Sequence, residues 1–413
     1  MGRDSLDLLL VRGSLGNNIL ENFMREKLQE FEDSENINVN ITLISWNRAY
    51  ERIISAFKSY NSPDLLLLGT SWVQSLAYQG YLLPINEYNN EKNILTAWFE
   101  ECCFFQGNRV AVPWVVEPMI MVAREDILDK LGVNKAELST WEGFLKLYIE
   151  IVERRKKDPS FPKAMSFFIR QDLGALHSFM SWCFASGFQF PDLKSDKILA
   201  SSEVIEVFKY LHKLIISSDI KFEDVDKHPY KINEDFYKHG SYVFYVGHWY
   251  GMTSQLLGIN ENINENYTYL PLKIPSKNLK KGTHGGGSVL CISSRTKHPL
   301  KARSLLEFLL EEGFVEGWMH HTANLPAFET HFWKQRYNNE GIRNLYKLAV
   351  NSNNLPYHPC WSSIENILIE GVSHCMWTLF NASEKIEREI KPILSKIDQD
   401  IHEILKMSWE MNC

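Results

Sequence analysis

Short apolar segments alternate with amphipathic ones at the start of this chain, and the alternation limits the fold that the chain can adopt. Residues 6–11, 37–44 and 65–68 read as buried strands, while residues 19–31 and the segment opening at Trp46 carry apolar side chains at helical spacing. This order predicts a parallel sheet with helices on both faces. Ligands of such sheets bind beyond the carboxyl ends of the strands. The loops to inspect are therefore residues 12–17, 45–48 and 69–72.

The size and charge of the chain narrow its class. Its 413 residues, 45% of them hydrophobic and 23% charged, suit two lobes of about 150–200 residues each. A formal net charge of -7 argues against a nucleic-acid binder, which would usually show a basic face. No apolar stretch is long enough for a transmembrane helix. No signal peptide is visible, because residues 6–11 are too short a run and include Asp7.

The cysteines give no sign of a disulfide framework or a metal site. There are seven, an odd number, with no Cys-x-x-Cys spacing. The adjacent Cys102 and Cys103 make a poor ordinary disulfide pair and form no zinc motif. We therefore expect mostly buried free thiols, a pattern that is mildly unusual for an oxidising compartment.

A glycine-rich segment in the second half of the chain belongs to a longer series of motifs. Glycines at residues 285–287 enter an apolar strand at residues 289–292, a helix carries apolar residues over 302–310, and an Asn-Leu-Pro exit follows at residues 324–326. Three earlier segments fit the same series: residues 63–85 (PDLLLLGTSWVQSLAYQGYLLPI), residues 109–122 (RVAVPWVVEPMIMV) and residues 237–252 (YKHGSYVFYVGHWYGM). In this order they resemble the bacterial extracellular solute-binding proteins of the sugar-binding family, the group that contains maltose-binding protein.

The resemblance implies an α/β chain with a two-lobed, periplasmic-binding-protein-like (type II) fold and a ligand cleft between the lobes. The N-terminal lobe is expected at residues 2–111 plus 283–322, and the C-terminal lobe at residues 112–282 plus 323–413. Three hinge crossings are expected near residues 111–118, 278–285 and 320–326.

The function implied by the resemblance is capture of a sugar, in particular an oligosaccharide, by hinge closure and its delivery to the permease subunits of an ABC transporter. We expect a monomer with no cofactor, no metal and no nucleic-acid partner. The implied location is periplasmic, or extracellular with a membrane anchor; the leader would then be missing from this sequence, and a cytoplasmic location stays open. One alternative function is a ligand sensor that signals to a membrane receptor kinase. A less favoured alternative is a carbohydrate-active enzyme.

The expected ligand-binding residues are of two kinds, because sugars offer apolar ring faces and hydroxyl groups. Sites for small ligands combine an apolar wall with a few placed polar groups. The expected stacking residues are Trp72, Trp114, Trp249 and Trp361. The expected polar partners are Arg12, Asn47, Ser71, Glu117, Asp172, His177 and His284, with backbone amides at Gly285 and Gly286. For Ser71, Trp72 and Glu117 the assignment follows motifs of the resembled family.

Several of these residues also have purely structural interpretations. Trp249 could pack against the hinge, and Trp361 could cap its helix against the core. Glu117 follows a buried strand, where an unpaired carboxylate is costly, so it needs either ligand hydroxyls or a structural arginine. Arg12 could form an ion pair within its own lobe. Trp46 opens an amphipathic helix, where a core role is at least as well supported.

Signatures of enzymes are absent from the sequence. There is no G-x-S-x-G, no H-E-x-x-H and no Walker A motif. The glycine run at residues 282–287 precedes a strand and not a helix, so it lacks the geometry of a phosphate cradle. Glu117 and Asp172 could in principle act as a glycosidase pair, but nothing in their spacing favours catalysis over binding.

Overall fold

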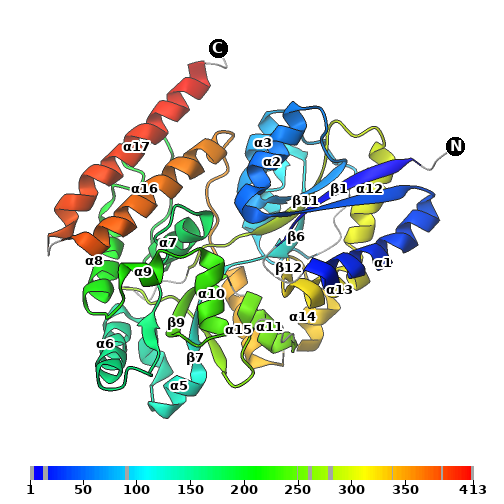
Figure 1. Cartoon of the computed structure of the whole chain (residues 1–413). Coiled ribbons are helices and arrows are strands. Elements are labelled where there is room, and N and C mark those ends of the chain that lie inside the picture. Colours follow the sequence, from blue (N-terminus) through cyan, green and yellow to red (C-terminus); the bar gives the residue numbers. More distant parts are fainter. Residues whose placement is uncertain are drawn as a thin grey trace.

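Two helix-covered sheets organise the computed structural model, which describes residues 4–12, 17–88, 93–248, 250–258, 263–277, 282–336, 338–382 and 385–410 (Figure 1). The larger sheet has the strand order β12 (Leu325–Pro326), β6 (Val112–Val116), β11 (Gly287–Ile292), β3 (Leu65–Gly69), β1 (Ser5–Arg12) and β2 (Asn38–Ser45). β1 pairs in parallel with β2 and β3, which confirms the parallel sheet predicted from the alternation of apolar segments. β11 joins this sheet antiparallel to both β3 and β6.

The larger sheet is covered on both faces, which explains its continuous apolar runs. All four leucines of β3 are buried, and so are Leu8 and Leu10 of β1. The predicted helix after β11 is confirmed, since it buries Ala302, Leu305, Leu306 and Leu309. The helices of this lobe are α1 (Asn17–Glu35), α2 (Trp46–Lys58), α3 (Val73–Tyr78), α4 (Ala97–Glu101), α12 (Pro299–Leu309) and α13 (Glu312–Thr322). A small hairpin, β4 (Phe104–Phe105) and β5 (Asn108–Arg109), completes it.

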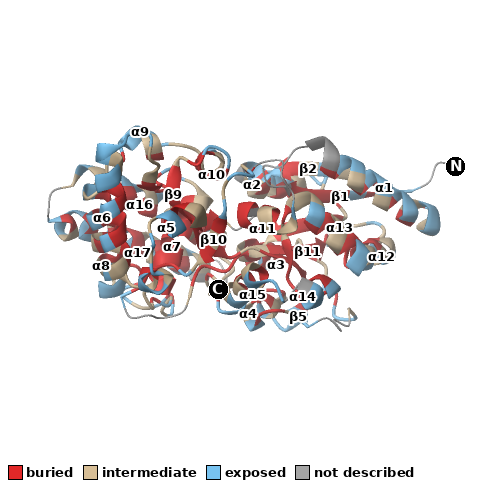
Figure 2. Cartoon of the chain, turned by 90° about the horizontal axis from the view of Figure 1, so that it is seen from below, coloured by how far each residue is buried: buried red, intermediate tan, exposed pale blue. Residues whose placement is uncertain are grey.

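The smaller sheet organises the second lobe, in the order β10 (Tyr269–Leu272), β7 (Met119–Arg124), β9 (Tyr242–His248) and β8 (Lys163–Met165). Its helices up to β9 are α5 (Glu125–Lys130), α6 (Trp141–Lys157), α7 (Leu173–Ala185), α8 (Ser202–Ile216), α9 (Phe222–Val225) and α10 (Pro229–Tyr237). Those after β9 are α11 (Tyr250–Leu257), α14 (His331–Arg336), α15 (Glu340–Val350), α16 (Trp361–Asn381) and α17 (Ile386–Glu410). Figure 2 shows buried residues concentrated within both halves of the elongated molecule.

The chain passes between the two sheets along segments that lie side by side. β6 ends in the larger sheet and β7 begins in the smaller one, so the first passage falls at residues 117–118. The Glu117 amide donates to the Gly286 carbonyl at 2.8 Å, and the Met119 amide donates to the His284 carbonyl at 2.9 Å. A third segment, around Asn353, lies beside these two crossing segments, because the Asn353 amide donates to the Thr283 carbonyl at 2.8 Å.

The strand pairing differs from the predicted lobe boundaries at two places. Residues 112–116 were expected to open the C-terminal lobe, but they pair as β6 within the larger sheet. Residues 320–326 were expected to form the third crossing; they fall on α13 and β12, and β12 also belongs to the larger sheet. The six described cysteines are free thiols, and all but Cys360 are buried. Within the described part of the chain, no helix has the length and apolar character needed to span a bilayer.

Candidate ligand-binding site

A cavity of about 700 Å³ lies between the two lobes and is lined by residues of both. Its volume falls within the usual range for small-molecule sites, about 300–1,000 Å³. The carboxyl ends of β2 and β3 contribute Trp46 and residues 69–72, so two of the three loops flagged from the sequence do reach the cavity. The crossing segments contribute Glu117, His284 and Gly286 to its floor.

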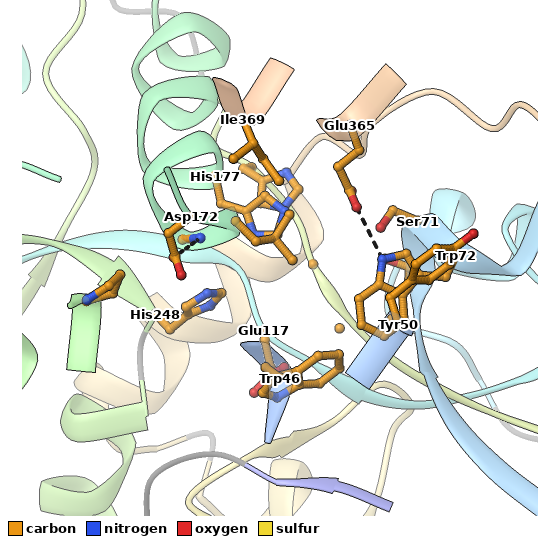
Figure 3. A pocket seen from close by; sticks show the side chains of 18 of the residues that line it. Trp46, Tyr50, Ser71, Trp72, Glu117, Asp172, His177, His248, Glu365 and Ile369 are labelled. Carbon is orange, nitrogen blue, oxygen red and sulfur yellow. Dashed lines mark hydrogen bonds between the residues drawn. The ribbon is translucent and has the colours of Figure 1, made fainter. Parts of the chain in front are cut away.

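Aromatic side chains of the first lobe form one wall of the cavity, which we call the aromatic wall: Trp46, Tyr50 and Trp72 (Figure 3). The ring centroids of Trp46 and Trp72 are 5.5 Å apart, and those of Tyr50 and Trp72 are 5.4 Å apart, both pairs tilted by 56°. Both indoles also pack against Gly69, since a Cβ built there would lie in ordinary van der Waals contact with each ring, at 3.5 Å. The wall is therefore a packed cluster in which the rings fix one another.

Glu365 of α16 ties the aromatic wall to the second lobe. Its Oε2 accepts from Trp72 Nε1 at 3.2 Å, and its Oε1 accepts from Trp361 Nε1 at 3.3 Å. Burial raises the pKa of Glu365, and hydrogen bonds from Ser71, Trp72 and Trp361 offset part of that rise. A second bond between the lobes runs from the Ser362 amide to Ser75 Oγ at 3.3 Å. The first turn of α16 is thus docked on the first lobe.

Histidines of the second lobe and of the crossing segment face the cavity on its other side, and we call this group the histidine corner: His177, His248 and His284. His177 stacks on His284 with centroids 4.0 Å apart and an interplanar angle of 30°, while His248 meets His177 edge-on at 6.1 Å. Burial is the main cause that lowers the pKa of all three imidazoles, to about 4 for His248 and about 3 for His284. All three are therefore neutral near pH 7.

Glu117 projects between the aromatic wall and the histidine corner (Figure 3). Burial raises its pKa to about 7, and no cationic side chain of the described residues contributes to the shift. Among those residues, therefore, no structural arginine acts on this carboxyl. Asp172 also lines the cavity, but its Oδ1 accepts from the Gly174 amide at 2.7 Å and caps α7.

The predicted site residues fall into groups. Seven line the cavity: Ser71, Trp72, Glu117, Asp172, His177, His284 and Gly286. Trp114, Trp361 and Gly285 are not among the lining residues. Trp114 is buried against Trp318 at 4.6 Å between centroids, and Trp361 is buried behind Glu365. Trp249 lies outside the described residues, as do the side chains of Arg12 and Asn47.

Sequence reasoning did not select several residues that line the cavity, including Tyr50, His248 and Glu365. A signal for His248 was present, because it directly follows a glycine-ended apolar strand. Tyr50 lies one turn beyond Trp46, at the start of a helix that follows a flagged loop. For Glu365 there is no signal, since a carboxylate near the start of a helix is usually solvent-exposed.

Two helix-covered sheets, adjacent crossing segments and a lined cavity between the lobes are the architecture of a two-lobed solute-binding protein. The comparisons with known proteins agree. The chain matches the family model for bacterial extracellular solute-binding proteins over residues 17–315, and it belongs to that family.

Individual relatives are distant in sequence but similar over most of the chain. A curated binding protein of Brucella abortus (strain 2308) is 19% identical over 382 residues, covering 90% of this chain and 88% of the relative. Maltose-bound MalE3 of T. maritima superposes with a TM-score of 0.79 at 16% identity, covering 96% of this chain and 99% of that one. A tagatose-bound ABC transporter solute-binding protein of Thermotoga lettingae gives 0.78 at 16% identity, with coverages of 96% and 100%. These likenesses establish the two-lobed fold.

Proposed function

We propose that this protein is the substrate-binding component of a carbohydrate ABC importer and that it captures a sugar in the cavity between its lobes. The observation that carries the proposal is the pairing of an aromatic wall with polar groups across one cavity. Trp46 and Trp72 offer flat apolar faces, while Glu117 and the histidine corner offer hydrogen-bonding groups. Similar structures hold tagatose, maltose and cycloalternan, which supports a sugar as the ligand.

In the proposed mechanism the sugar docks on one lobe, and closure brings the groups of the other lobe onto it. Closure is driven only by the additional affinity of the ligand for the closed state. Glu365 and Ser362 support this role for α16, because both already bond across the lobes. The proposed ligand-binding residues are the seven predicted residues that line the cavity, together with Trp46, Tyr50 and His248.

The proposed partners are the permease subunits of an importer, which a monomeric binding protein would meet at a membrane surface. We propose an extracytoplasmic location with a membrane anchor, in line with the family's extracellular character. Binding without chemical change of the sugar is part of the same proposal.

A thermal-shift screen of mono- and oligosaccharides, followed by calorimetry on each sugar that raises the melting temperature, tests the proposal. We expect at least one oligosaccharide to bind in the micromolar range or tighter, which corresponds to about -8 kcal/mol. Chromatography of the same mixtures after overnight incubation should return the sugar unchanged. Appearance of shorter products would support a carbohydrate-active enzyme, and a panel with no binder would reject sugar capture.

A further inference from the structure

Several ring nitrogens of the histidine corner have no hydrogen-bond partner among the residues that the structure describes. These are His177 Nε2, His248 Nδ1 and both ring nitrogens of His284, and all of them are buried. The three residues come from α7, from the end of β9 and from the crossing segment, and all line the cavity. Buried polar atoms are normally paired, so unpaired ones on side chains that line a cavity indicate a place for a ligand.

The surroundings of this corner carry acidic and neutral groups. Glu117 and Asp172 both line the cavity here, and both act on the pKa of the neighbouring Tyr230. Arg170 also lines the cavity, but its side chain is 51% exposed and lies 4.0 Å from Asp226. His228 Nδ1 accepts from the Tyr230 amide at 3.3 Å. Within the described residues, no group of His, Cys, Asp and Glu is arranged to hold a metal ion.

We propose that the histidine corner is a subsite for the hydroxyl groups of an uncharged sugar residue, and that it excludes a sugar residue bearing a carboxylate. This inference rests on the proposed function and specifies the class of ligand at one end of the cavity. His177, His248 and His284 are the residues that determine this specificity.

The chemistry of a neutral imidazole accounts for the preference. Each ring has one donor nitrogen and one acceptor nitrogen, and a sugar hydroxyl can likewise donate and accept. Two adjacent hydroxyls can therefore satisfy nitrogens that the protein leaves unpaired. A carboxylate only accepts. Here it would lose its hydration beside Glu117 and Asp172, and the described residues that line the cavity include no buried cation to offset its charge.

Calorimetry on matched oligosaccharides tests the charge preference. The probes are a neutral oligosaccharide that binds and two derivatives of it, one with a uronate as its first residue and one with a uronate as its last. At pH 7.5 we expect one of the two derivatives to bind at least about a hundredfold more weakly, because that end enters the histidine corner. If both derivatives bind as well as the neutral sugar, or if either binds more tightly, the inference is overturned while sugar capture stands. If no neutral oligosaccharide binds, sugar capture and the inference fail together.

Substitutions test whether the ring nitrogens are responsible. His284→Phe keeps the ring stacked on His177 and removes both nitrogens, so we expect at least about a tenfold loss of affinity for the neutral sugar. If His284→Phe does not fold, the affinity of His177→Phe for the neutral sugar provides the same test. His212→Phe is the matched control, because His212 is a buried histidine of α8 with an unpaired Nε2 that does not line the cavity. Unchanged affinity in both cavity variants, or an equal loss in the control, would overturn the assignment.

Discussion

The aromatic wall and the histidine corner face the same cavity, but they are completed in different ways. In the aromatic wall, the Trp72 indole N–H is already bonded to Glu365, and the rings of Trp46 and Tyr50 hold the Trp72 ring in place. In the histidine corner, the rings of His177 and His284 stack on each other while their nitrogens have unpaired positions. The protein itself supplies the contacts that hold the aromatic wall, whereas the histidine corner keeps hydrogen-bonding positions open.

This difference shows how one site can combine rigidity with selectivity. A stacking surface works best when it is fixed before the ligand arrives, because ordering it during binding would cost affinity. Polar specificity works the other way, since buried groups left unpaired penalise any ligand that fails to satisfy them. Substitutions that break the supports of the wall should therefore affect stability, and substitutions in the cavity should affect affinity.

The largest expected effect is on stability, from Glu365→Ala. The substitution leaves the buried N–H groups of Trp72 and Trp361 without an acceptor, and one such group costs about 1–3 kcal/mol. We expect the free energy of unfolding in urea to fall by about 2–4 kcal/mol. Glu370→Ala is the control on the exposed side of the same helix and should have little effect. Equal urea midpoints for the two variants would show that Glu365 does not support the wall.

The next effect is on affinity, from Trp46→Ala. Trp46 is half-buried, so its loss should cost less stability than loss of a fully buried ring, and it removes one ring face of the aromatic wall. We expect sugar binding to weaken by at least about tenfold, about 1.4 kcal/mol, when measured by calorimetry. Trp377→Ala removes an exposed indole of α16 that does not line the cavity and should leave affinity unchanged. Wild-type affinity in the Trp46→Ala variant would show that the aromatic wall is not part of the binding site.

Much of the fold could be predicted from the sequence, because it follows from the spacing of apolar residues along the chain. The apolar runs that became β1 and β3 and the helical face of α12 depend only on periodicity and chain order. The position of His284 and Gly286 in the cavity followed from the glycine-rich segment that resembles the family.

The spacing of residues does not show which tryptophans line the cavity. Trp72 and Trp361 both follow loop-like sequence, yet one lines the cavity and the other is buried behind Glu365. Both indoles donate to Glu365, so this hydrogen bond does not distinguish them. The difference is one of tertiary placement, because Trp361 packs into the core of the second lobe, and local sequence does not reveal that. Trp114 is similar, since its contact with Trp318 joins residues that are far apart in the chain.

A smaller effect concerns the pH dependence of stability and centres on Glu117. Its pKa is raised to about 7 in the folded protein, so the folded state binds a proton that the unfolded state has already released. Stability from this group is complete below the unfolded pKa of about 4.5 and is lost as pH rises through about 7.

Glu117→Gln isolates this contribution from that of the histidines, whose lowered pKa values act in the opposite direction. Relative to Glu117→Gln, the wild-type melting temperature should fall between pH 5 and pH 8 in a series of thermal scans. A constant difference between the two proteins across that range would contradict the raised pKa. Such a result would mean that the Glu117 carboxyl is hydrated or ion-paired in the folded protein, and not a buried group awaiting a ligand.

The smallest expected effect comes from the second bond between the lobes. Ser75→Ala removes the hydroxyl that accepts from the Ser362 amide, a single neutral hydrogen bond worth about 0.5–1.5 kcal/mol. Because Ser362 is only half-buried, water can replace part of the bond, and the loss in urea unfolding should be at the low end of that range. Ser363→Ala, at an exposed neighbouring position, is the control. A loss as large as that of Glu365→Ala would mean that α16 is held to the first lobe mainly by its backbone, and the buried carboxylate would not be what fixes the aromatic wall.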